Sequence, residues 1–364
     1  ISAVVNPILD VQGKLINAVC VMTDITNTKV HEVLQYRVLN AMARDSSLAE
    51  QMNLLCEEVE RVAPEVIASV LRVDEHGRLH TLAAPSLPEA YTRAIEGIQI
   101  GPLVGSCGSA AYTGQSVVSE EIATDPHWAD YKEIALSHGL QACWSTPIKS
   151  ADGKVIGTFG FYYRQPRAPS AFHHLLVDAG LHLCALAIER EASRARIHQL
   201  AFYDSLTGLP NRSLLEQRIA AAIARAERAQ GSFALLFLDL DGFKLVNDRH
   251  GHAAGDQVLK HFAELLRSLL RKSDIIGRIG GEEFAVILPD THRQAAAALA
   301  GEILRRTAAL EVLHDRDTLV RFTVSIGISA YPDFANVNAL MSQADKALYR
   351  AKKNGRNRVE VCQE

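Results

Sequence analysis

Cysteine is scarce in this sequence and is not arranged for cross-linking or for metal binding. The 364 residues include six cysteines, at positions 20, 56, 107, 143, 184 and 362, with no CxxC pair and no close spacing. Disulfide frameworks and structural zinc sites depend on paired or closely spaced cysteines. The pattern therefore argues against both, and it favours a reducing, cytoplasmic compartment.

Long hydrophobic runs are also missing. The apolar stretches are short, as in Phe233 to Leu238, whereas a membrane-spanning helix needs about 20 apolar residues. The chain opens at Ile1 rather than at Met, and no basic segment followed by an apolar one marks a signal peptide. We therefore expect no membrane segment in this chain and expect it to be a piece of a longer protein.

A strong excess of positive charge is absent as well. From Leu200 onward 22 Lys and Arg stand against 20 Asp and Glu, a net of +2, whereas the first 199 residues hold 16 against 22, a net of −6. Nucleic-acid-binding proteins show a larger and more clustered basic excess, so we expect no nucleic acid partner. The mildly basic C-terminal half is compatible with a phosphate ligand and equally with ordinary scatter.

The chain is long enough for two domains and some extra residues. Hydrophobic residues make up 48% of the 364, which is enough to bury cores, and a domain takes roughly 150 residues. The first 27 residues predict a strand, a turn at Gln12-Gly13 and a second strand, too little chain for a core. The stretch MTDITNTKVHE (22–32) resembles the last strand of a PAS sensor domain and its helical exit. Residues 1–27 are therefore expected to be the C-terminal remnant of a PAS domain.

Residues 28–172 predict a mixed domain of helices and antiparallel strands. Apolar positions at helical spacing run through 30–62 and are interrupted near Asp45. Strand-like segments follow at 66–73, 81–83, 141–147 and 155–163, with a Gly- and Ser-rich loop predicted at 101–115. This pattern, and above all CWSTPIKSADGKVIGTFGFYYRQPRAP (143–169), resembles the GAF sensor domains that precede cyclic-dinucleotide enzymes.

A long helix is predicted after Pro169, and we expect residues 173–201 to form a signalling helix. Its apolar residues fall at spacings of seven that polar residues interrupt: Leu176, Leu183 and Ile197, and likewise Leu186 and Leu200. This spacing favours a two-stranded coiled coil through which two chains dimerise. One amphipathic helix packed on its own domain fits the same pattern.

From Phe202 onward helices and strands alternate in a way typical of an α/β sandwich with a mostly antiparallel sheet. Helices are predicted at 214–228, 254–270, 295–309 and 337–353, and a strand at 233–238. Ile279-Gly280-Gly281-Glu282 predicts a tight turn between two apolar strands, because glycine permits positive φ angles.

Acidic residues stand at two of these strand ends. Asp239 and Asp241 close one strand with their side chains on the same face, and Glu282 and Glu283 sit at the Gly-Gly turn. If the two loops meet, carboxylates so close together repel each other unless a divalent cation lies between them. Oxygen-only ligands favour Mg²⁺ over zinc. Ordinary solvated acids at strand ends are the alternative for either pair alone.

Cations and amide-bearing residues follow the first acidic pair. Lys244 precedes Asn247 and Asp256, and Lys352 and Arg356 come near the end of the chain at helical spacing of four. The three cations would lie along a phosphate chain if the last helix packs beside the first. Asn and Asp side chains together can pair with the edge of guanine and discriminate against other bases by roughly 10⁴.

Five sequence blocks now resemble one family, in order and in spacing. They are DSLTGLPNR (204–212), FLDLDGFKLVNDRHGHAAGD (237–256), GRIGGEEF (277–284), TVSIGIS (323–329) and ADKALYRAKKNGRNRV (344–359). Together they resemble the GGDEF family of diguanylate cyclases over residues 202–364, with the signature present as GGEEF.

The resemblance implies a role for each matching residue. Asp239 and Glu282 would ligate Mg²⁺ (or Mn²⁺), with the Leu240 carbonyl as a further ligand, and Glu282 would assist deprotonation of the attacking 3′-hydroxyl. The GTP-binding residues that the resemblance implies are Asn247 and Asp256 for guanine and Lys244, Lys352, Arg356 and the N–H groups of Gly242 and Phe243 for the phosphates. Family members often carry a bulkier residue where Gly242 stands. Two such half-sites in a homodimer, joined through the sensor and the linker helix, would convert two GTP into cyclic di-GMP and two pyrophosphates.

Arg271 and Asp274 form an RxxD tetrapeptide nine residues before Gly280. At this spacing it resembles the family's product-inhibition site, where Arg and Asp hold cyclic di-GMP, and Arg can grip a phosphate or a guanine edge bidentately. An ordinary surface helix end is the alternative.

The sensor half gives weaker signals. Residues that could line a GAF pocket are Cys107, His127, Trp128, Tyr131, Cys143 and Trp144, but a core or loop role fits each of them better. The fourteen histidines include no HExxH motif or cluster that would indicate haem or metal.

Three readings of function remain open. The first is an active diguanylate cyclase regulated by the GAF domain, and the second is a catalytically silent GGDEF module that binds GTP or cyclic di-GMP and regulates a partner. The third is an unrelated nucleotidyl cyclase with the same core, against which Asn247 and Asp256 favour guanine. Relatives with this domain order often continue into an EAL phosphodiesterase domain, so the full protein could also degrade its product.

Overall fold

A computed structural model describes residues 2–9, 12–13, 15–23, 26–315 and 318–362 of the chain. The chain divides into two compact units, Ile1–Arg194 and Ala195–Glu364. Each unit has one five-stranded sheet with helices on both faces. The predicted mixture of helices with mostly antiparallel strands is confirmed in both units.

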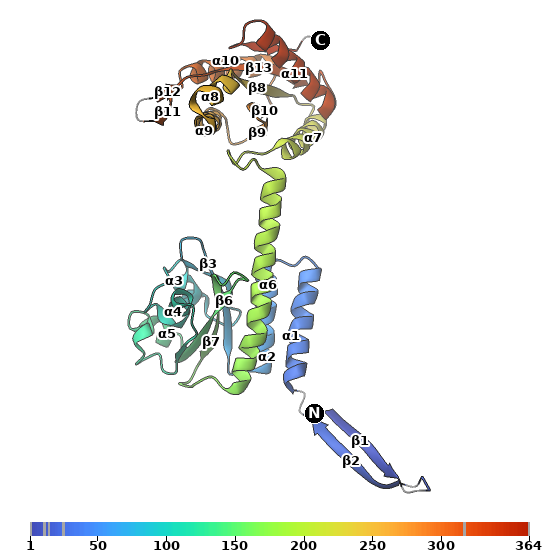
Figure 1. Ribbon diagram of the computed structural model, residues 1–364, viewed down its shortest axis with the longest axis vertical. Helices are drawn as coiled ribbons and strands as arrows, with labels where there is room; N and C mark the ends of the chain where they lie inside the picture. The colour runs from blue at the N-terminus through green and yellow to red at the C-terminus, as the bar shows by residue number, and fades with distance from the viewer. Residues whose placement is uncertain (1, 10–11, 14, 24–25, 316–317, 363–364) are drawn as a thin grey trace. The chain divides into compact units, whose positions relative to one another are not determined.

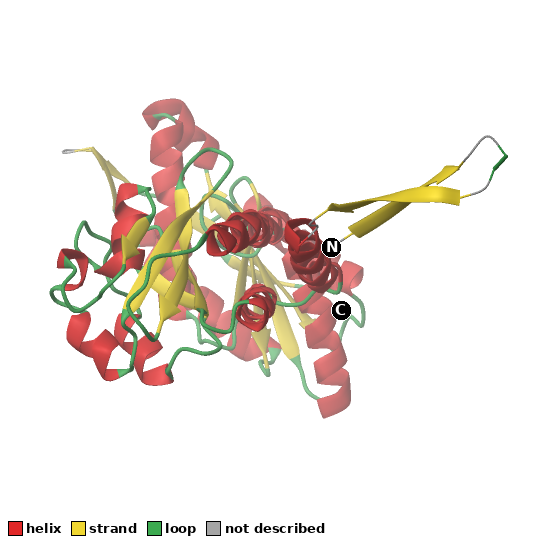
Figure 2. Cartoon of the chain, turned by 90° about the horizontal axis from the view of Figure 1, so that it is seen from below, coloured by secondary structure: helices red, strands yellow, loops and turns green. Residues whose placement is uncertain are grey.

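The first unit begins with an isolated hairpin of β1 (Ser2–Leu9) and β2 (Leu15–Thr23), which pair antiparallel as predicted. Figure 2 shows these strands as a two-stranded ribbon. Apolar side chains such as Val5, Ile16 and Met22 are exposed on it, and a two-stranded hairpin is only marginally stable by itself. Asp24 and Ile25, within the stretch that resembles a PAS exit, lie outside the described residues.

The sheet of the first unit has the order β4-β3-β7-β6-β5, and every neighbouring pair is antiparallel. Its strands are β3 (Ile67–Val73), β4 (Leu79–Ala83), β5 (Val117–Ser119), β6 (Ala142–Lys149) and β7 (Val155–Tyr163). The short strand β5 was not predicted. The other four match the predicted segments to within two residues at each end.

Helices cover both faces of this sheet. One face packs against α1 (Thr26–Ala43), α2 (Leu48–Val62) and the first part of α6 (Ala171–Phe202). The break between α1 and α2 falls where the sequence predicted it, and Ser47 caps α2 in a capping box with Glu50. The opposite face packs against α3 (Glu89–Ile95), α4 (Gly105–Thr113) and α5 (Lys132–Ser137), with a 3₁₀ turn at Pro126–Trp128.

The prediction of a loop at 101–115 is wrong, because helix α4 occupies most of this segment. Gly, Ser and Ala fill this helix, and its residues 105–111 are all buried. Small side chains let a helix lie close against a sheet, so tertiary packing outweighs the low helix propensity of Gly and Ser. The helix ends at Gly114, whose φ of +66° is a typical C-terminal cap.

Helix α6 changes character along its length. Leu176 and Leu183 are buried in the core of the first unit, so that part follows the amphipathic-helix alternative. Ile197 and Leu200, in contrast, are 66% and 63% exposed. Among the described residues α6 is the one helix with the length and apolar composition to cross a membrane, but half of its apolar window is buried within the protein, as in a core helix.

The sheet of the second unit has the order β14-β13-β8-β10-β9 and confirms the predicted α/β sandwich. Its strands are β8 (Phe233–Asp241), β9 (Ile275–Gly280), β10 (Glu283–Pro289), β13 (Thr323–Tyr331) and β14 (Val359–Val361). Only the β13–β14 pair is parallel among the described strands of this sheet. A small hairpin of β11 (Val312–Asp315) and β12 (Thr318–Val320) was not predicted.

Two layers of helices enclose this second sheet (Figure 1). Helices α7 (Arg212–Ala229) and α11 (Val337–Lys353) pack on one face. Helices α8 (Phe243–His250), α9 (His252–Leu269) and α10 (Arg293–Ala308) pack on the other. Helix α11 lies so close to β13 that a Cβ on Gly327 would stand 2.2 Å from the Ala344 carbonyl oxygen. Glycine at this position therefore sets how near α11 comes to the sheet.

Candidate active site

The acidic strand end and the Gly-Gly turn meet, which is the condition that the sequence analysis set for a shared carboxylate site. Strand β8 lies between β13 and β10, and Glu283 is directly opposite Asp239 in the β10–β8 register. The Leu240 N–H donates to the Glu282 carbonyl oxygen at 3.3 Å, which joins the turn to the end of β8. The backbone thus brings Asp239, Glu282 and Glu283 together at one end of the neighbouring strands β8 and β10.

Asp239 is a buried carboxyl in an acidic environment. Its residue is 5% exposed, and burial raises its pKa to about 6, with a further upward contribution from Glu282 and Glu283. Lys352 opposes this rise, because its Nζ lies 2.6 Å from Asp239 Oδ2. Carboxylates directly opposite one another in an antiparallel pair destabilise it. A cation at this edge would relieve that repulsion.

The donor set at this edge fits a hard divalent cation. Two carboxylates, Asp239 and Glu282, and the backbone oxygens beside them offer oxygen ligands without nitrogen or sulfur, which suits Mg²⁺ or Mn²⁺. Within the described ranges no three His, Cys, Asp or Glu side chains gather into a ready metal site. A set of two carboxylates and one carbonyl, as the resemblance implies, does not require a third such side chain.

Asp241 has a different task from Asp239. Its carboxylate accepts hydrogen bonds from the Thr323 and Ser325 hydroxyls, both at 2.7 Å, and from the Asn357 N–H at 3.0 Å. These three donors occupy its oxygens. Asp241 therefore ties the turn after α11 to the end of β8.

Lys352 and Arg356 do not share a helical face, which corrects the sequence expectation. Helix α11 ends at Lys353, and Gly355, Arg356 and Asn357 have φ values of +114°, +60° and +47°. Successive left-handed residues end a helix, and the Arg356 N–H still donates to the Ala351 carbonyl oxygen at 3.0 Å. Lys352 lies on the helix, whereas Arg356 lies in the turn that Asp241 holds.

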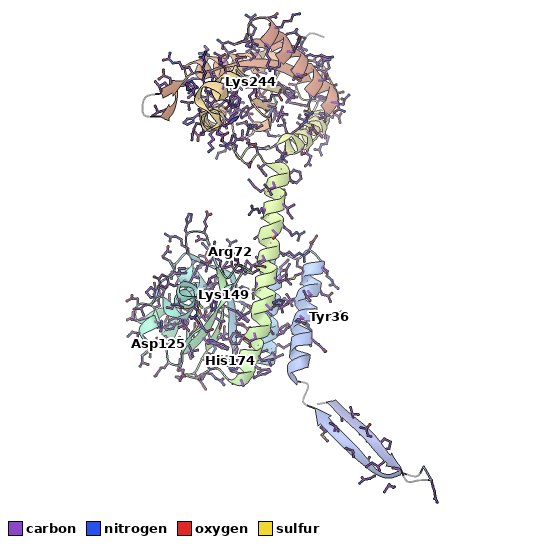
Figure 3. The ribbon with its side chains drawn as sticks, viewed as in Figure 1. Tyr36, Arg72, Asp125, Lys149, His174 and Lys244 are labelled. Atoms are coloured by element: carbon purple, nitrogen blue, oxygen red, sulfur yellow. The ribbon has the colours of Figure 1, made fainter. Side chains whose placement is uncertain are left out.

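The loop after β8 offers backbone N–H groups at the start of α8. Gly242 precedes this helix with a φ of +71°, and Phe243 is buried in the core beneath it. Lys244, labelled in Figure 3, is exposed on α8. A Cβ on Gly242 would meet nothing within 4 Å, so the bulkier residues of relatives have room there but require a left-handed backbone.

Asn247 and Asp256 lie on the adjoining helices α8 and α9. A Cβ on Gly255 would stand 2.0 Å from Asn247 Oδ1, so this glycine makes room for the Asn247 side chain at the start of α9. Asp256 follows directly and is exposed. The two residues expected to bind guanine therefore belong to one region of the surface.

One group of residues at the site was missed by the sequence reasoning. The Arg278 guanidinium donates from Nη1 to both carboxylate oxygens of Asp204, at 2.9 and 3.0 Å. The same guanidinium donates from Nε and Nη2 to the Gly281 carbonyl oxygen, at 3.0 and 2.7 Å. Both residues stand in quoted blocks, DSLTGLPNR and GRIGGEEF, but nothing in those blocks shows that they meet. Arg278 thus fixes the turn that carries Glu282.

Arg271 and Asp274 lie in the turn between α9 and β9. The Arg271 N–H donates to Asp274 Oδ2 at 2.9 Å, and the Asp274 N–H donates to the Arg271 carbonyl oxygen at 3.0 Å. The Arg271 side chain is exposed and free to meet a ligand through its guanidinium.

The candidate pocket residues of the first unit divide between different places. Cys107, Trp128 and Tyr131 border a cavity of about 30 Å³. Cys143 is buried on the same face of the sheet, whereas Trp144 points to the other face and packs on His174 of α6, labelled in Figure 3. His127 Nδ1 instead lies 2.8 Å from Asp125 Oδ1, so it does not join the others.

Comparisons with known proteins match both units. The family described as "Diguanylate cyclase, GGDEF domain" matches residues 201–358, and the GAF domain family matches residues 45–189. The diguanylate cyclase DgcP of Pseudomonas aeruginosa is 43% identical over 181 residues, which are 48% of this chain and 27% of that protein. The diguanylate cyclase TpbB of Pseudomonas aeruginosa is 41% identical over 202 residues, 53% of this chain and 46% of that protein.

A similar solved structure is the GGDEF domain of DgcB from Caulobacter crescentus in complex with c-di-GMP. It is 34% identical, with a TM-score of 0.43, and the match covers 45% of this chain and 94% of that one. This chain spans less than half the length of the curated relatives it matches. The domain boundaries expected after residues 27, 172 and 201 stay predictions.

The raised pKa of Asp239 predicts a pH dependence of stability in metal-free protein. The folded chain keeps this proton up to a pH of about 6, whereas the unfolded chain releases it near 3.8. The folded state therefore binds more protons between these values, and stability falls as pH rises, by about 3 kcal/mol in total.

Asp239→Asn removes this titration but keeps the shape of the side chain. At pH 3, below both pKa values, the folded and unfolded wild-type chains are mostly neutral at this position, and we expect the variant and the wild type to have similar free energies of unfolding. At pH 7 the variant should be more stable by about 3 kcal/mol. Circular dichroism in urea with a chelator present measures the difference, and parallel pH profiles would contradict the assigned pKa.

Proposed function

Residues 201–358 are a GGDEF domain and residues 45–189 a GAF domain, and on this premise we propose that the chain is a diguanylate cyclase under sensory control. Two GTP molecules would be condensed to cyclic di-GMP with release of two pyrophosphates. The observation that carries the proposal is the convergence of Asp239 with the Glu282 turn beside Lys352. Ionising a buried carboxyl with a raised pKa costs free energy, and a bound cation would offset that cost.

The residues of this chain divide the work of binding and positioning. Asp239, Glu282 and the Leu240 carbonyl would hold Mg²⁺ or Mn²⁺, which when bound polarises phosphoryl oxygens and stabilises developing negative charge. Glu282 would accept the proton of the 3′-hydroxyl. Lys352 would leave Asp239 for a phosphate once a cation takes its place.

The substrate would lie along the edge that α8, α9 and the turn after α11 share. Asn247 and Asp256 would pair with guanine, and a base that left them unpaired would be rejected by roughly 10⁴. Lys244, Arg356 and the N–H groups at the start of α8 would hold the triphosphate. The N-terminus of a helix favours an anion at this place.

A single chain contains one half of the proposed reaction centre. Each 3′-oxygen must attack the α-phosphate of the other GTP, so two sites have to face each other in a two-fold homodimer. The exposed Ile197 and Leu200 on α6 are suitable apolar contacts for such a dimer. Because α6 continues from the first unit into the second, it is also the proposed path of regulation by the GAF domain in the cytoplasm.

Glu282→Ala tests the proposed chemistry most directly. We expect the purified variant to bind GTP but to make cyclic di-GMP at least 10²-fold more slowly, the scale for loss of one electrostatic stabiliser. Glu264→Ala, which removes an exposed glutamate of α9, is the matched control and should retain full activity. Product formation by chromatography against GTP and Mg²⁺ concentration is the measurement.

The competing functions give different results in that assay. Wild-type protein that binds GTP without any product would favour the silent module. Conversion of ATP in preference to GTP would favour a different nucleotidyl cyclase. Near-normal synthesis of cyclic di-GMP by Glu282→Ala would contradict the proposed catalytic role of Glu282.

Arg278→Lys tests whether the Gly-Gly turn must be held in place. Lysine keeps the charge beside Asp204 but cannot also donate two hydrogen bonds to the Gly281 carbonyl. We expect kcat to fall by up to about 10² while KM for GTP changes little, because misplacement affects the reacting geometry more than ground-state binding. An equal loss through KM, or a variant that fails to fold by circular dichroism, would contradict this positioning role.

Arg271→Ala tests the proposed inhibitory site. The variant should show the wild-type initial rate and a Kd for cyclic di-GMP at least about tenfold weaker, because a bidentate charged contact is lost. Lys272→Ala changes the charge of the same turn by the same amount and should leave inhibition close to normal. Equal effects of both substitutions would point to general charge rather than to a specific grip by Arg271.

A further inference from the structure

Two cysteines of the first unit meet where α4 packs on the sheet. Cys107 lies in the first turn of α4, and Cys143 lies in β6 opposite Tyr162 of β7. Cys107 Sγ is 3.7 Å from the Tyr162 hydroxyl, and a Cβ on Gly160 would stand 3.1 Å from it. The Cys107 thiol thus points onto the sheet beside Cys143: both belong to one cluster of buried side chains, and the hydroxyl of Ser106, the residue before Cys107, donates to the Cys143 carbonyl oxygen at 3.2 Å.

Two hydroxyl groups beside this thiol lack ordinary partners. Ser145 and Thr158 are fully buried, and their hydroxyl oxygens have no hydrogen-bond partner in the part of the chain that the structure describes. Buried polar groups are almost always paired, so unpaired ones call for an explanation. Both hydroxyls lie next to Cys107, where a thiolate would accept the hydrogen bonds that a neutral thiol accepts poorly.

These donors give Cys107 the character of a reactive thiol. The neighbouring Cys143 thiol lowers the pKa of Cys107 most, the nearby hydroxyls of Ser145, Tyr162 and Thr158 lower it further, and burial acts in the opposite direction. The first turn of a helix also favours a thiolate. Burial meanwhile raises the pKa of Cys143, so one sulfur of the pair is suited to attack and the other to remain protonated until needed.

A small molecule has a place beside this sulfur. Cys107 borders the cavity of about 30 Å³ together with Tyr91, Trp128 and Tyr162. This volume corresponds to about one water molecule, so it suits a reactant with very few heavy atoms rather than a nucleotide or a cofactor.

We propose that Cys107 and Cys143 form a reversible disulfide in reaction with hydrogen peroxide, which makes this pair a redox modification site of the sensor unit. The Cys107 thiolate attacks one peroxide oxygen, an S–O bond forms, the O–O bond breaks, and the hydroxide that leaves takes a proton to become water. Cys143 then attacks Cys107 Sγ, the S–S bond forms, and the S–O bond breaks with release of a second water. Two thiols are oxidised and one peroxide is reduced, and a dithiol reductant reverses the change.

The other face of the same sheet offers an internal control. Cys56 of α2 and Cys184 of α6 are both buried, and they influence each other electrostatically. Burial raises the pKa of both thiols, and no hydroxyl contributes to lowering it. Both pairs consist of buried cysteines that lie near each other. Only the pair at Cys107 also has neighbouring hydroxyl groups that lower the pKa of a thiol.

The site also has a built-in optical reporter. Trp128 Nε1 donates to the Ser106 hydroxyl at 3.1 Å, and this hydroxyl donates to the Cys143 carbonyl oxygen at 3.2 Å. Trp144 follows Cys143 directly in β6, and the chain has two tryptophans in all. We therefore expect the intrinsic fluorescence of the intact chain to change when this pair is modified.

The test treats the whole wild-type chain with hydrogen peroxide and maps its peptides by mass spectrometry. We expect a cross-link between the peptides of Cys107 and Cys143, 2 Da lighter than their sum, that dithiothreitol removes. It should form at least about tenfold faster than Cys56 or Cys184 is modified, since reactivity follows thiolate character. A parallel change in tryptophan fluorescence should be absent in Cys107→Ser and, separately, in Cys143→Ala.

Several results would overturn this assignment. One is oxidation of Cys107 to sulfinic acid without any cross-link, and another is a Cys56–Cys184 cross-link that forms equally fast. A third is no reaction of either cysteine at peroxide concentrations that oxidise the exposed Cys20. None of these readouts involves GTP, so the outcome is independent of the proposed cyclase activity.

Discussion

The buried carboxyl of Asp239 is the constraint on which the C-terminal unit depends. It lies at the C-terminal end of the central strand β8, with Glu283 directly across on β10 and Lys352 as the neighbouring cation. A carboxylate in such surroundings resists ionisation, as its pKa of about 6 shows. The fold thus maintains a charge arrangement that is unfavourable by itself and that a bound divalent cation would make favourable, as is typical of the perturbed carboxyls found at functional sites.

Around this carboxyl, other side chains act only by holding backbone in place. Asp241 uses its oxygens on β13 and on the turn after α11, and Arg278 joins Asp204 to the Gly-Gly turn. These contacts fix the two segments that carry Arg356 and Glu282. Precise positioning matters for phosphoryl transfer, because the protein contributes alignment and electrostatics more than covalent chemistry.

The positions of Asp239, Glu282 and Glu283 at a strand end and a turn were well predicted from the sequence, because strand periodicity and a Gly-Gly turn are local signals. It predicted the C-terminal end of α11 less well: Arg356 was expected on the helix, but α11 ends at Lys353, and Arg356 lies in a turn with a positive φ of its own. It could not show that Asp204 meets Arg278, since the two are 74 positions apart and depend on how β9 pairs. Helix α4 was missed for a related reason. Gly and Ser have low helix propensity and predict a loop, and this segment is helical because it packs against the sheet.

In the sensor unit, two neighbouring residues of β6 face opposite sides of the sheet. Cys143 faces α4 and the cavity, whereas Trp144 faces the opposite core and packs on His174 at a ring-centroid distance of 4.5 Å. Successive residues of a strand point to opposite faces, so any shift of β6 at Cys143 also moves Trp144. His174 lies in the first turn of α6, the helix that continues into the second unit. The start of this helix therefore contacts Trp144, the residue directly after Cys143. A close-packed core transmits such a shift rather than absorbing it.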